Sequence, residues 1–338
     1  MNLFSRIQHN SNPRTQRWEA LLSRTFFVVA LLFLGLSLTG CARLAKVSDT
    51  SIPRMVTPVV TADFSQLLAQ LKPFTDVQTL RASRIALRFI EPQAETRWRD
   101  ADAIVVLQRP DRIRLVIQIP VTKSRVAEMV SEANHFKVAV YQERPSFILG
   151  TNDADYAQWR ERLGKDKQSA LVNARPFHFT DALLMRPLHT GEGGYAYSLE
   201  EQLQEESETK PNQKKVTRVL RSYYVMSELK LADNGQAYAL RRFWFDRTDN
   251  LLLKRQQIFD GRGGLVTEVT YSNYQKLGEA NAATLPTVVL VSRPHDGYGA
   301  RFSFSPENFE LNPELPATAF VLENKENLPE TDLDKPVK

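Results

Sequence analysis

Apolar and polar residues alternate at every second position through most of the chain beyond residue 83. The pattern is clearest in DRIRLVIQIPV, where Ile113, Leu115 and Ile117 point one way and Arg114 and Gln118 point the other. A period of two is typical of a β-strand with one face on a core. It predicts two sets of antiparallel strands, in the ranges 83–91, 101–110, 111–121, 125–132, 135–142, 144–150, 222–232, 237–247, 251–260, 265–275, 285–293, 300–305 and 317–323.

Three short stretches have the period of a helix instead. In residues 64–72 the apolar positions fall at i, i+3, i+4 and i+7, Asp63 stands where an N-cap is needed, and Pro73 should end the helix. Residues 154–163 predict a second helix, and residues 181–188 predict a third that Thr180 can cap. Residues 200–215 are polar without an apolar period and predict a solvated loop, while the chain after residue 323 predicts a frayed polar tail.

These elements indicate a mainly β fold with helices, of the α+β class. A sheet of this size cannot stay flat, so we expect a large curled antiparallel sheet, an incomplete barrel, covered by short helices. The concave apolar face of such a sheet can enclose a ligand cavity or form an ordinary packed core. Alternation alone does not separate these two possibilities, because both put apolar residues on the same face.

The beginning of the chain has the pattern of a targeting segment. Four arginines precede an apolar run over residues 26–38, which is too short to cross a bilayer comfortably. The run ends in Leu38-Thr39-Gly40-Cys41, which resembles the lipobox of bacterial lipoproteins. That resemblance implies cleavage before Cys41, a diacylglyceryl thioether on its sulfur and an acylated new N-terminus. The alternative is an ordinary secretory signal or an N-terminal membrane anchor.

The lipoprotein interpretation divides the chain into four parts. Residues 1–40 would be the signal peptide, 41–61 a lipidated tether, 62–322 the folded domain with a helical and loop insertion at about 152–221, and 323–338 the polar tail. Ala42, in place of an acidic residue, resembles the outer-membrane sorting signal of enteric bacteria. We therefore expect a lipid-anchored protein of the outer membrane, facing the periplasm.

Composition removes several classes of function. The net charge is +5, but the leader alone carries +3, so the mature part is only +2 and does not indicate nucleic-acid binding. Cys41 is the only cysteine, so its modification would leave no thiol for a disulfide or a metal. The five histidines have no metal-ligand spacing, and no G-x-S-x-G nucleophile motif occurs. We expect neither an enzyme nor a cofactor beyond the covalent lipid on Cys41.

Two stretches about twenty residues apart resemble the LolA/LolB family of periplasmic lipoprotein carriers and acceptors. The first holds a strand, an Arg-Pro turn and a second strand, and the second is a hairpin: Gln108-Arg109-Pro110-Asp111-Arg112-Ile113 and Val130-Ser131-Glu132-Ala133-Asn134-His135-Phe136-Lys137-Val138. The order of motifs from Asp246 through Asp260, Tyr271 and Pro286 to Pro294 is similar to the second half of such domains.

The resemblance implies an unclosed barrel with helices as a lid over an apolar cavity for acyl chains. In the carrier, the arginine of the Arg-Pro turn hydrogen-bonds to the lid and governs its opening, and Arg109 occupies that position. The family has an aromatic residue at the position of Ile113, so this chain lacks one part of the carrier's opening mechanism. The cavity would be lined by Leu87, Phe89, Arg109, Ile113, Leu115 and Ile117.

Three functions follow from these observations. The leading hypothesis is a membrane-anchored envelope lipoprotein that binds a lipid or the acyl chain of a lipoprotein. The alternative is an assembly or scaffold lipoprotein that binds another envelope protein and has a filled core. An envelope hydrolase with an unrecognised site is a third, weaker option.

Overall fold

The computed structural model describes residues 52–90, 99–142, 144–152, 154, 156, 175–209, 216–278 and 283–335. Contacts divide the chain into Met1–Ile52 and Pro53–Lys338, and the second unit contains all the elements named below. Cys41, the tether up to residue 51 and most of the predicted helix at 154–163 lie outside the described residues. No helix in the described ranges is long and apolar enough to span a bilayer.

The expected fold class is confirmed. The helical elements are α2 (Phe64–Thr75), η3 (Pro176–Phe179), α5 (Thr180–Leu183) and η5 (Pro306–Asn308). The strands are β1 (Arg54–Met55), β2 (Thr79–Ile90), β3 (Arg99–Gln108), β4 (Arg112–Gln118), β5 (Arg125–Glu132), β6 (His135–Val140), β7 (Ser146–Thr151), β8 (Tyr195–Thr209), β9 (Val216–Leu231), β10 (Ala237–Asp246), β11 (Leu252–Phe259), β12 (Leu265–Leu277), β13 (Ala283–Arg293), β14 (Tyr298–Ser303), β15 (Phe309–Leu311) and β16 (Glu330–Asp332).

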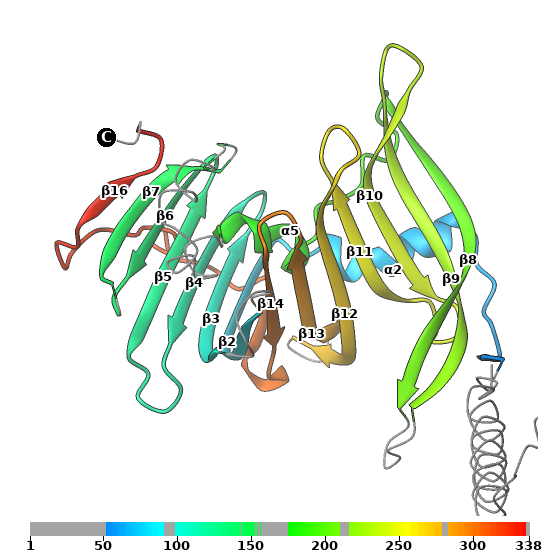
Figure 1. Ribbon diagram of the computed structural model, residues 1–338, viewed down its shortest axis with the longest axis horizontal. Helices are drawn as coiled ribbons and strands as arrows, with labels where there is room; N and C mark the ends of the chain where they lie inside the picture. Colours follow the sequence, from blue (N-terminus) through cyan, green and yellow to red (C-terminus); the bar gives the residue numbers. More distant parts are fainter. Residues whose placement is uncertain are drawn as a thin grey trace, which may run out of the picture. The chain divides into compact units, whose positions relative to one another are not determined.

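All of these strands belong to one sheet, so the two predicted sets are continuous (Figure 1). The strand order is β1-β9-β10-β11-β12-β13-β14-β2-β3-β4-β5-β6-β7-β16, with β8 beside β9 and β15 beside β2. The two sets join where β14 pairs with β2, for example at Phe302 and Leu87. Only β1 and β16 pair in parallel, with β9 and β7 respectively. The sheet remains open, with β8 at one end and β7, extended by the short β16, at the other.

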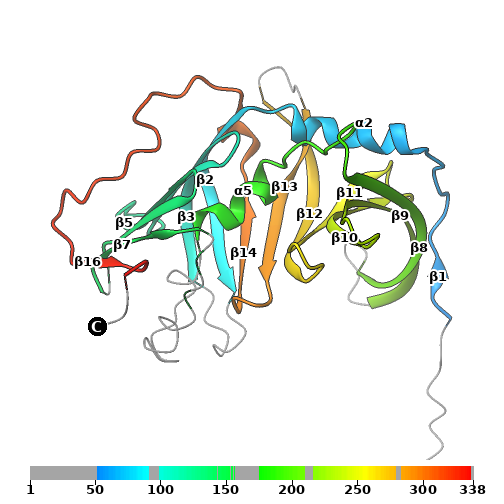
Figure 2. The same ribbon diagram turned by 90° about the horizontal axis from the view of Figure 1, so that it is seen from above.

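The apolar positions of the strands meet on the face of the sheet that packs against the helices, which we call the inner face. Alternate residues of β2 and β4 are buried there together with Leu67 and Leu71 of α2 and Phe179 of η3. Figure 2 shows α2 running past β11 and β12, with α5 beside β13 and β14. The inner face is therefore covered by two separate helical pieces.

Helix α2 begins at the predicted place but ends later. The Asp63 carboxylate accepts a hydrogen bond from the Gln66 N–H (2.8 Å), and the Gln66 side chain accepts one from the Asp63 N–H (2.9 Å). The predicted end at Pro73 is wrong, because the helix continues to Thr75. Only one hydrogen bond is lost when proline lies in a last turn, and the Asp76 N–H still bonds to the Lys72 carbonyl.

Replacement of Asp63 by alanine is expected to lower the free energy of unfolding by about 0.5–2 kcal/mol, because the Gln66 N–H and the Ser65 hydroxyl lose their acceptor. Urea unfolding of the wild type, Asp63→Ala and Asp63→Asn measures this. Asparagine keeps a capping oxygen, so Asp63→Asn should lie close to the wild type. Equal losses in both variants would contradict a capping role.

The solvated loop predicted for residues 200–215 is wrong over residues 200–209, which belong to the fifteen-residue strand β8. Gln202, Gln204, Glu206 and Glu208 are half-buried while the residues between them are exposed. The period of two is present, but polar residues carry it, so a search for apolar alternation misses the strand. Residues 195–209 and 216–221, placed in the insertion by the sequence, are thus part of the sheet.

The end of the chain also differs from expectation. The strand predicted at 317–323 is a series of turns that puts Phe320 and Leu322 against Val130 and Phe147 on the outer face of the sheet. The predicted frayed tail instead adds β16 to the edge of β7. Figure 2 shows this segment running past β5 and β7. Similarly, residues 53–60 of the predicted tether are not free, since β1 pairs with β9.

Candidate functional site: the inner face and its lid segment

The five apolar residues proposed from the sequence lie together on the inner face. Leu87 and Phe89 are on β2, and Ile113, Leu115 and Ile117 are on β4, with β3 between the two strands. All five are buried; Phe89, at 7 %, is the most exposed. Phe179, Leu184 and Met185 belong to the same core cluster. We call residues 176–189, which include η3 and α5, the lid segment.

Arg109 lies at the β3–β4 turn and connects α2 with the lid segment. Its Nε donates to the Val77 carbonyl (2.7 Å), and its Nη2 donates to the carbonyls of Phe74 (3.0 Å) and Met185 (2.5 Å). Burial lowers the pKa of Arg109 from its ordinary value, and the carboxylates of Asp181 and Asp76 oppose this change. Charged donors make the stronger hydrogen bonds, so this one side chain links the two covers of the inner face.

A second arginine holds the end of the lid segment. Arg241 on β10 donates to the carbonyls of Arg186 (2.6 Å) and Pro187 (2.9 Å), and its Nε pairs with the Glu228 carboxylate (2.6 Å). Glu228 also accepts hydrogen bonds from the His189 N–H (2.9 Å) and from Tyr197 (3.2 Å). The sequence analysis did not find this pair, although both residues interrupt otherwise apolar positions of predicted strands.

Glu228 stays ionised despite being completely buried. Burial raises its pKa, but the hydrogen bond and the charge of Arg241, with the hydrogen bonds from His189, outweigh burial and hold the pKa below its ordinary value. The buried cation and anion therefore compensate each other, and three backbone groups of the lid segment complete their hydrogen bonding.

The beginning of the lid segment is attached through a buried histidine. His178 Nδ1 lies 2.5 Å from the Tyr298 hydroxyl on β14, and its Nε2 lies 3.1 Å from Arg293. Burial and the charges of Arg293 and Arg175 lower the pKa of His178 well below its ordinary value. The imidazole is therefore neutral at pH 7 and can accept from the guanidinium. His178 and Asp181 do not face each other in a catalytic arrangement, because Asp181 pairs with Arg186 instead.

An apolar cavity of about 20 Å³ lies between the end of α2, the lid segment and strands β12, β13 and β15. Phe74, Leu184, Leu285 and Phe309 are among its lining residues. A volume near 15 Å³ is needed for one water, so this cavity is far too small for an acyl chain. None of the five apolar residues proposed from the sequence lines it, because the lid segment already packs on them.

The described domain has the three features that the resemblance implied: an unclosed sheet, helical segments across its inner face, and an arginine that joins them. These features agree with the fold that the resemblance implied.

The solved structures that are similar to this chain include the following three. A LolA superfamily protein from Nitrosomonas europaea has 14% identity and a TM-score of 0.42, and the match covers 78% of this chain and 99% of that one. A DUF1329 family protein from Desulfovibrio piger has 12% identity and a TM-score of 0.43, with 76% and 95% covered. An outer membrane lipoprotein-sorting protein domain from Vibrio parahaemolyticus has 10% identity and a TM-score of 0.41, with 77% and 96% covered.

At these identities and TM-scores the similarities do not identify a ligand or a partner. No protein-family model matches the sequence, and no curated protein matches it. Within the part of the chain that the structure describes, no three His, Cys, Asp or Glu side chains are placed to hold a metal ion.

Proposed function

We propose that this protein is an envelope lipoprotein, anchored through Cys41 in the outer membrane, that binds one acyl chain of a lipid or lipoprotein on the inner face. Binding requires the lid segment to move away, because it occupies the space over Leu87, Phe89, Ile113, Leu115 and Ile117. Arg109 is the latch that holds the closed state.

One observation carries this proposal: the apolar inner face is covered by a short segment that is attached at separate polar points. His178 attaches the beginning of the lid segment, and Arg109 and Arg241 hold the consecutive residues Met185, Arg186 and Pro187 near its end. Between these points the Tyr271 hydroxyl lies 3.1 Å from the Ala182 carbonyl, and most other contacts are apolar side chains, which an acyl chain can replace. A cover of this kind can open while the sheet stays intact.

The small size of the cavity favours a second candidate, the scaffold lipoprotein with a filled core. Both candidates share the closed state, so they differ in whether the lid segment opens. Mature protein with Cys41→Ser, extracted into organic solvent and analysed by mass spectrometry, separates them. Lipid that is extracted in proportion to protein supports the carrier-like function, whereas lipid-free protein that also fails to bind a fluorescent fatty acid supports the scaffold.

Replacement of Arg109 by leucine is expected to tighten the apparent Kd for a fluorescent fatty acid by roughly tenfold, because loss of one charged hydrogen bond of about 1.5–3 kcal/mol raises the fraction of open protein. Arg109→Lys keeps the charge but not the three-way geometry and should lie between. Titration of the Cys41→Ser protein with the fatty acid measures the shift.

Arg112→Leu is the matched control, since Arg112 is only three residues away and forms an exposed ion pair with Glu132. It should leave the Kd unchanged. Identical affinity of the wild type and Arg109→Leu would rule out the latch, and absence of binding in every variant would rule out the carrier-like function itself.

A further inference from the structure

Strand β8 is the last strand at one end of the sheet. It pairs with β9 over its whole length, from Tyr195 opposite Lys230 to Thr209 opposite Val216. Its other edge has no partner strand among the described residues. Exposed edges of this length bind other strands readily, and proteins usually protect them with proline, lysine or a bulge. The range 195–209 contains no proline or lysine, and its register with β9 is uninterrupted.

The hydrogen-bond pattern between β8 and β9 shows which residues of β8 direct their backbone groups away from β9. The Leu231 N–H donates to the Gly194 carbonyl (2.8 Å), so Gly194 and Leu231 form a hydrogen-bonded pair. Such pairs alternate with non-bonded ones in an antiparallel ladder. The odd-numbered residues of β8, among them Leu199 and Leu203, therefore direct their N–H and C=O groups to the open edge.

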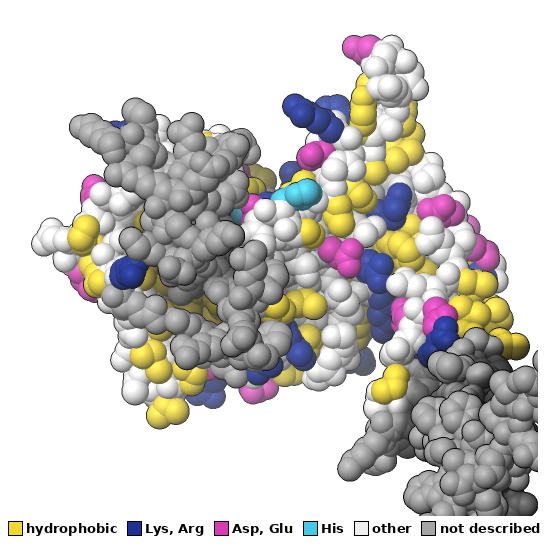
Figure 3. Space-filling view, in the orientation of Figure 1, with side chains coloured by type: hydrophobic (Ala, Val, Ile, Leu, Met, Phe, Trp, Pro, Cys, Tyr) yellow, Lys and Arg dark blue, Asp and Glu magenta, His cyan; other side chains and the backbone are white. Residues whose placement is uncertain are grey.

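The same odd-numbered residues place their side chains on the inner face. Leu199 lies opposite Met226, and Leu203 lies opposite Ser222. Both leucines are exposed, at 39% and 58%, although α2 contacts the neighbouring Tyr197 through Phe64. Figure 3 shows hydrophobic, acidic and basic side chains mixed over the end of the domain where β8 and β9 lie. An added strand could cover the leucines with apolar residues of its own.

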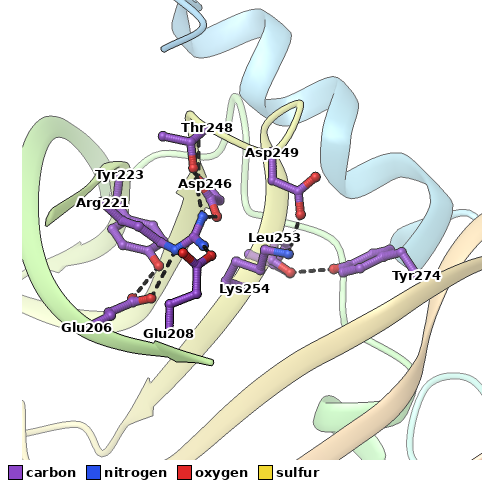
Figure 4. Close-up of polar contacts among 10 residues, drawn as sticks. All are labelled: Glu206, Glu208, Arg221, Tyr223, Asp246, Thr248, Asp249, Leu253, Lys254 and Tyr274. Carbon is purple, nitrogen blue, oxygen red and sulfur yellow. Dashed lines mark hydrogen bonds and ion pairs between the residues drawn. The ribbon is translucent and has the colours of Figure 1, made fainter. Parts of the chain in front are cut away.

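The charge of β8 determines which kind of segment can pair with its open edge. It carries five glutamates and no lysine or arginine. Arg247, Arg218 and Arg221 pair with four of them, so the edge keeps a net negative charge; Figure 4 shows Arg221 between Glu206, Glu208 and Asp246. Two copies of β8 paired with each other would place carboxylates side by side, which is destabilising. A second copy is therefore disfavoured, and a basic segment is favoured.

We propose that the open edge of β8 is a docking site for an extended segment of another protein, in which apolar residues alternate with lysine or arginine. Its backbone would bond to the outward N–H and C=O groups, its apolar side chains would cover Leu199 and Leu203, and its cations would face the side with Glu200 and Glu206. This mode is β-strand addition, in which the backbone gives affinity and alternate side chains give specificity. It is independent of the proposed lipid binding, which uses the opposite part of the inner face.

A synthetic peptide of about eight alternating valine and lysine residues, the usual length of a strand, is the probe. Fluorescence anisotropy measures its binding to the full chain in detergent. Leu203→Pro removes one outward N–H, and Leu203→Ala removes the same side chain but keeps the N–H. We expect binding to be roughly tenfold weaker for Leu203→Pro than for Leu203→Ala, which corresponds to one lost backbone hydrogen bond.

Two peptide controls keep the test valid if the proline variant folds poorly. The same peptide with N-methyl groups on alternate residues cannot form the ladder, and a valine–glutamate peptide has the wrong charge; both should bind at least tenfold more weakly. Equal binding of the N-methyl peptide, or of the valine–glutamate peptide, would overturn the proposal. So would a dimer of the full chain in sedimentation that Leu203→Pro abolishes, because the occupant would then be a second copy.

Discussion

Truncation of Leu115 to alanine is expected to lower the free energy of unfolding by about 2–5 kcal/mol, as in other packed cores. Leu115 is completely buried at the centre of β4, between β3 and β5, and belongs to the core cluster that includes α2 and the lid segment. Leu115 does not line the small apolar cavity. Urea unfolding measures the loss, which appears as a lower midpoint with an unchanged m-value, the slope of the unfolding free energy against urea concentration.

Enlargement at the same position gives the complementary result. Leu115→Trp should cost about 1–3 kcal/mol, because a close-packed interior has no room for the indole. Under the proposed function it should also weaken fatty-acid binding, since the indole would occupy part of the inner face. Val121→Ala is the control, because Val121 is 91% exposed. If Leu115→Ala unfolds at the same urea concentration as the wild type, the lid segment is open in solution.

Replacement of Arg241 by methionine is expected to cost about 3–5 kcal/mol, the usual penalty for leaving one partner of a buried ion pair alone. Glu228 would remain at zero exposure without its guanidinium, and two carbonyls of the lid segment would lose their donor. Chemical unfolding measures the loss. Arg242→Met is the matched control, since Arg242 is adjacent but lies on the outer face near Ser227.

The dependence of the unfolding free energy on pH, below neutrality, provides a second test of the Arg241–Glu228 pair. The pKa of Glu228 is lower in the folded protein than its ordinary value of 4.5, so its contribution is present above about pH 4.5 and is lost as the pH falls through the folded value. A Glu228→Gln and Arg241→Met double variant should recover part of the loss at pH 7 and unfold less steeply in acid. No recovery at pH 7 would show that the unpaired carboxylate is not the cause.

The strands were predictable wherever burial and side-chain alternation coincide. In β4, burial alternates residue by residue, and the sequence alone places Leu115 on the correct face. In β8 the half-buried positions are Gln202, Gln204, Glu206 and Glu208, and the two glutamates among them pair with Arg221 of β9. Arg221 lies thirteen or more residues away, so local sequence gives no sign that these acids belong to a strand.

The lid was predictable only in part, for a related reason. Arg109 follows from its position in a recognisable Arg-Pro turn. Arg241 is one of two adjacent arginines in a strand with apolar residues on both faces: Phe243 and Phe245 alternate with Arg241, and Trp244 alternates with Arg242. The alternation alone therefore does not show which arginine points inward.

The pairing of β14 with β2 has a consequence for how the chain acquires its structure. Strands β2 to β7 form from neighbouring residues, but both edges of that group are completed by the far end of the sequence: β14 and β15 on β2, and β16 on β7. Contacts of such long sequence separation form slowly. A chain that is synthesised from its N-terminal side therefore presents two open strand edges until residue 332 has been made, and open edges of this kind can pair with other chains.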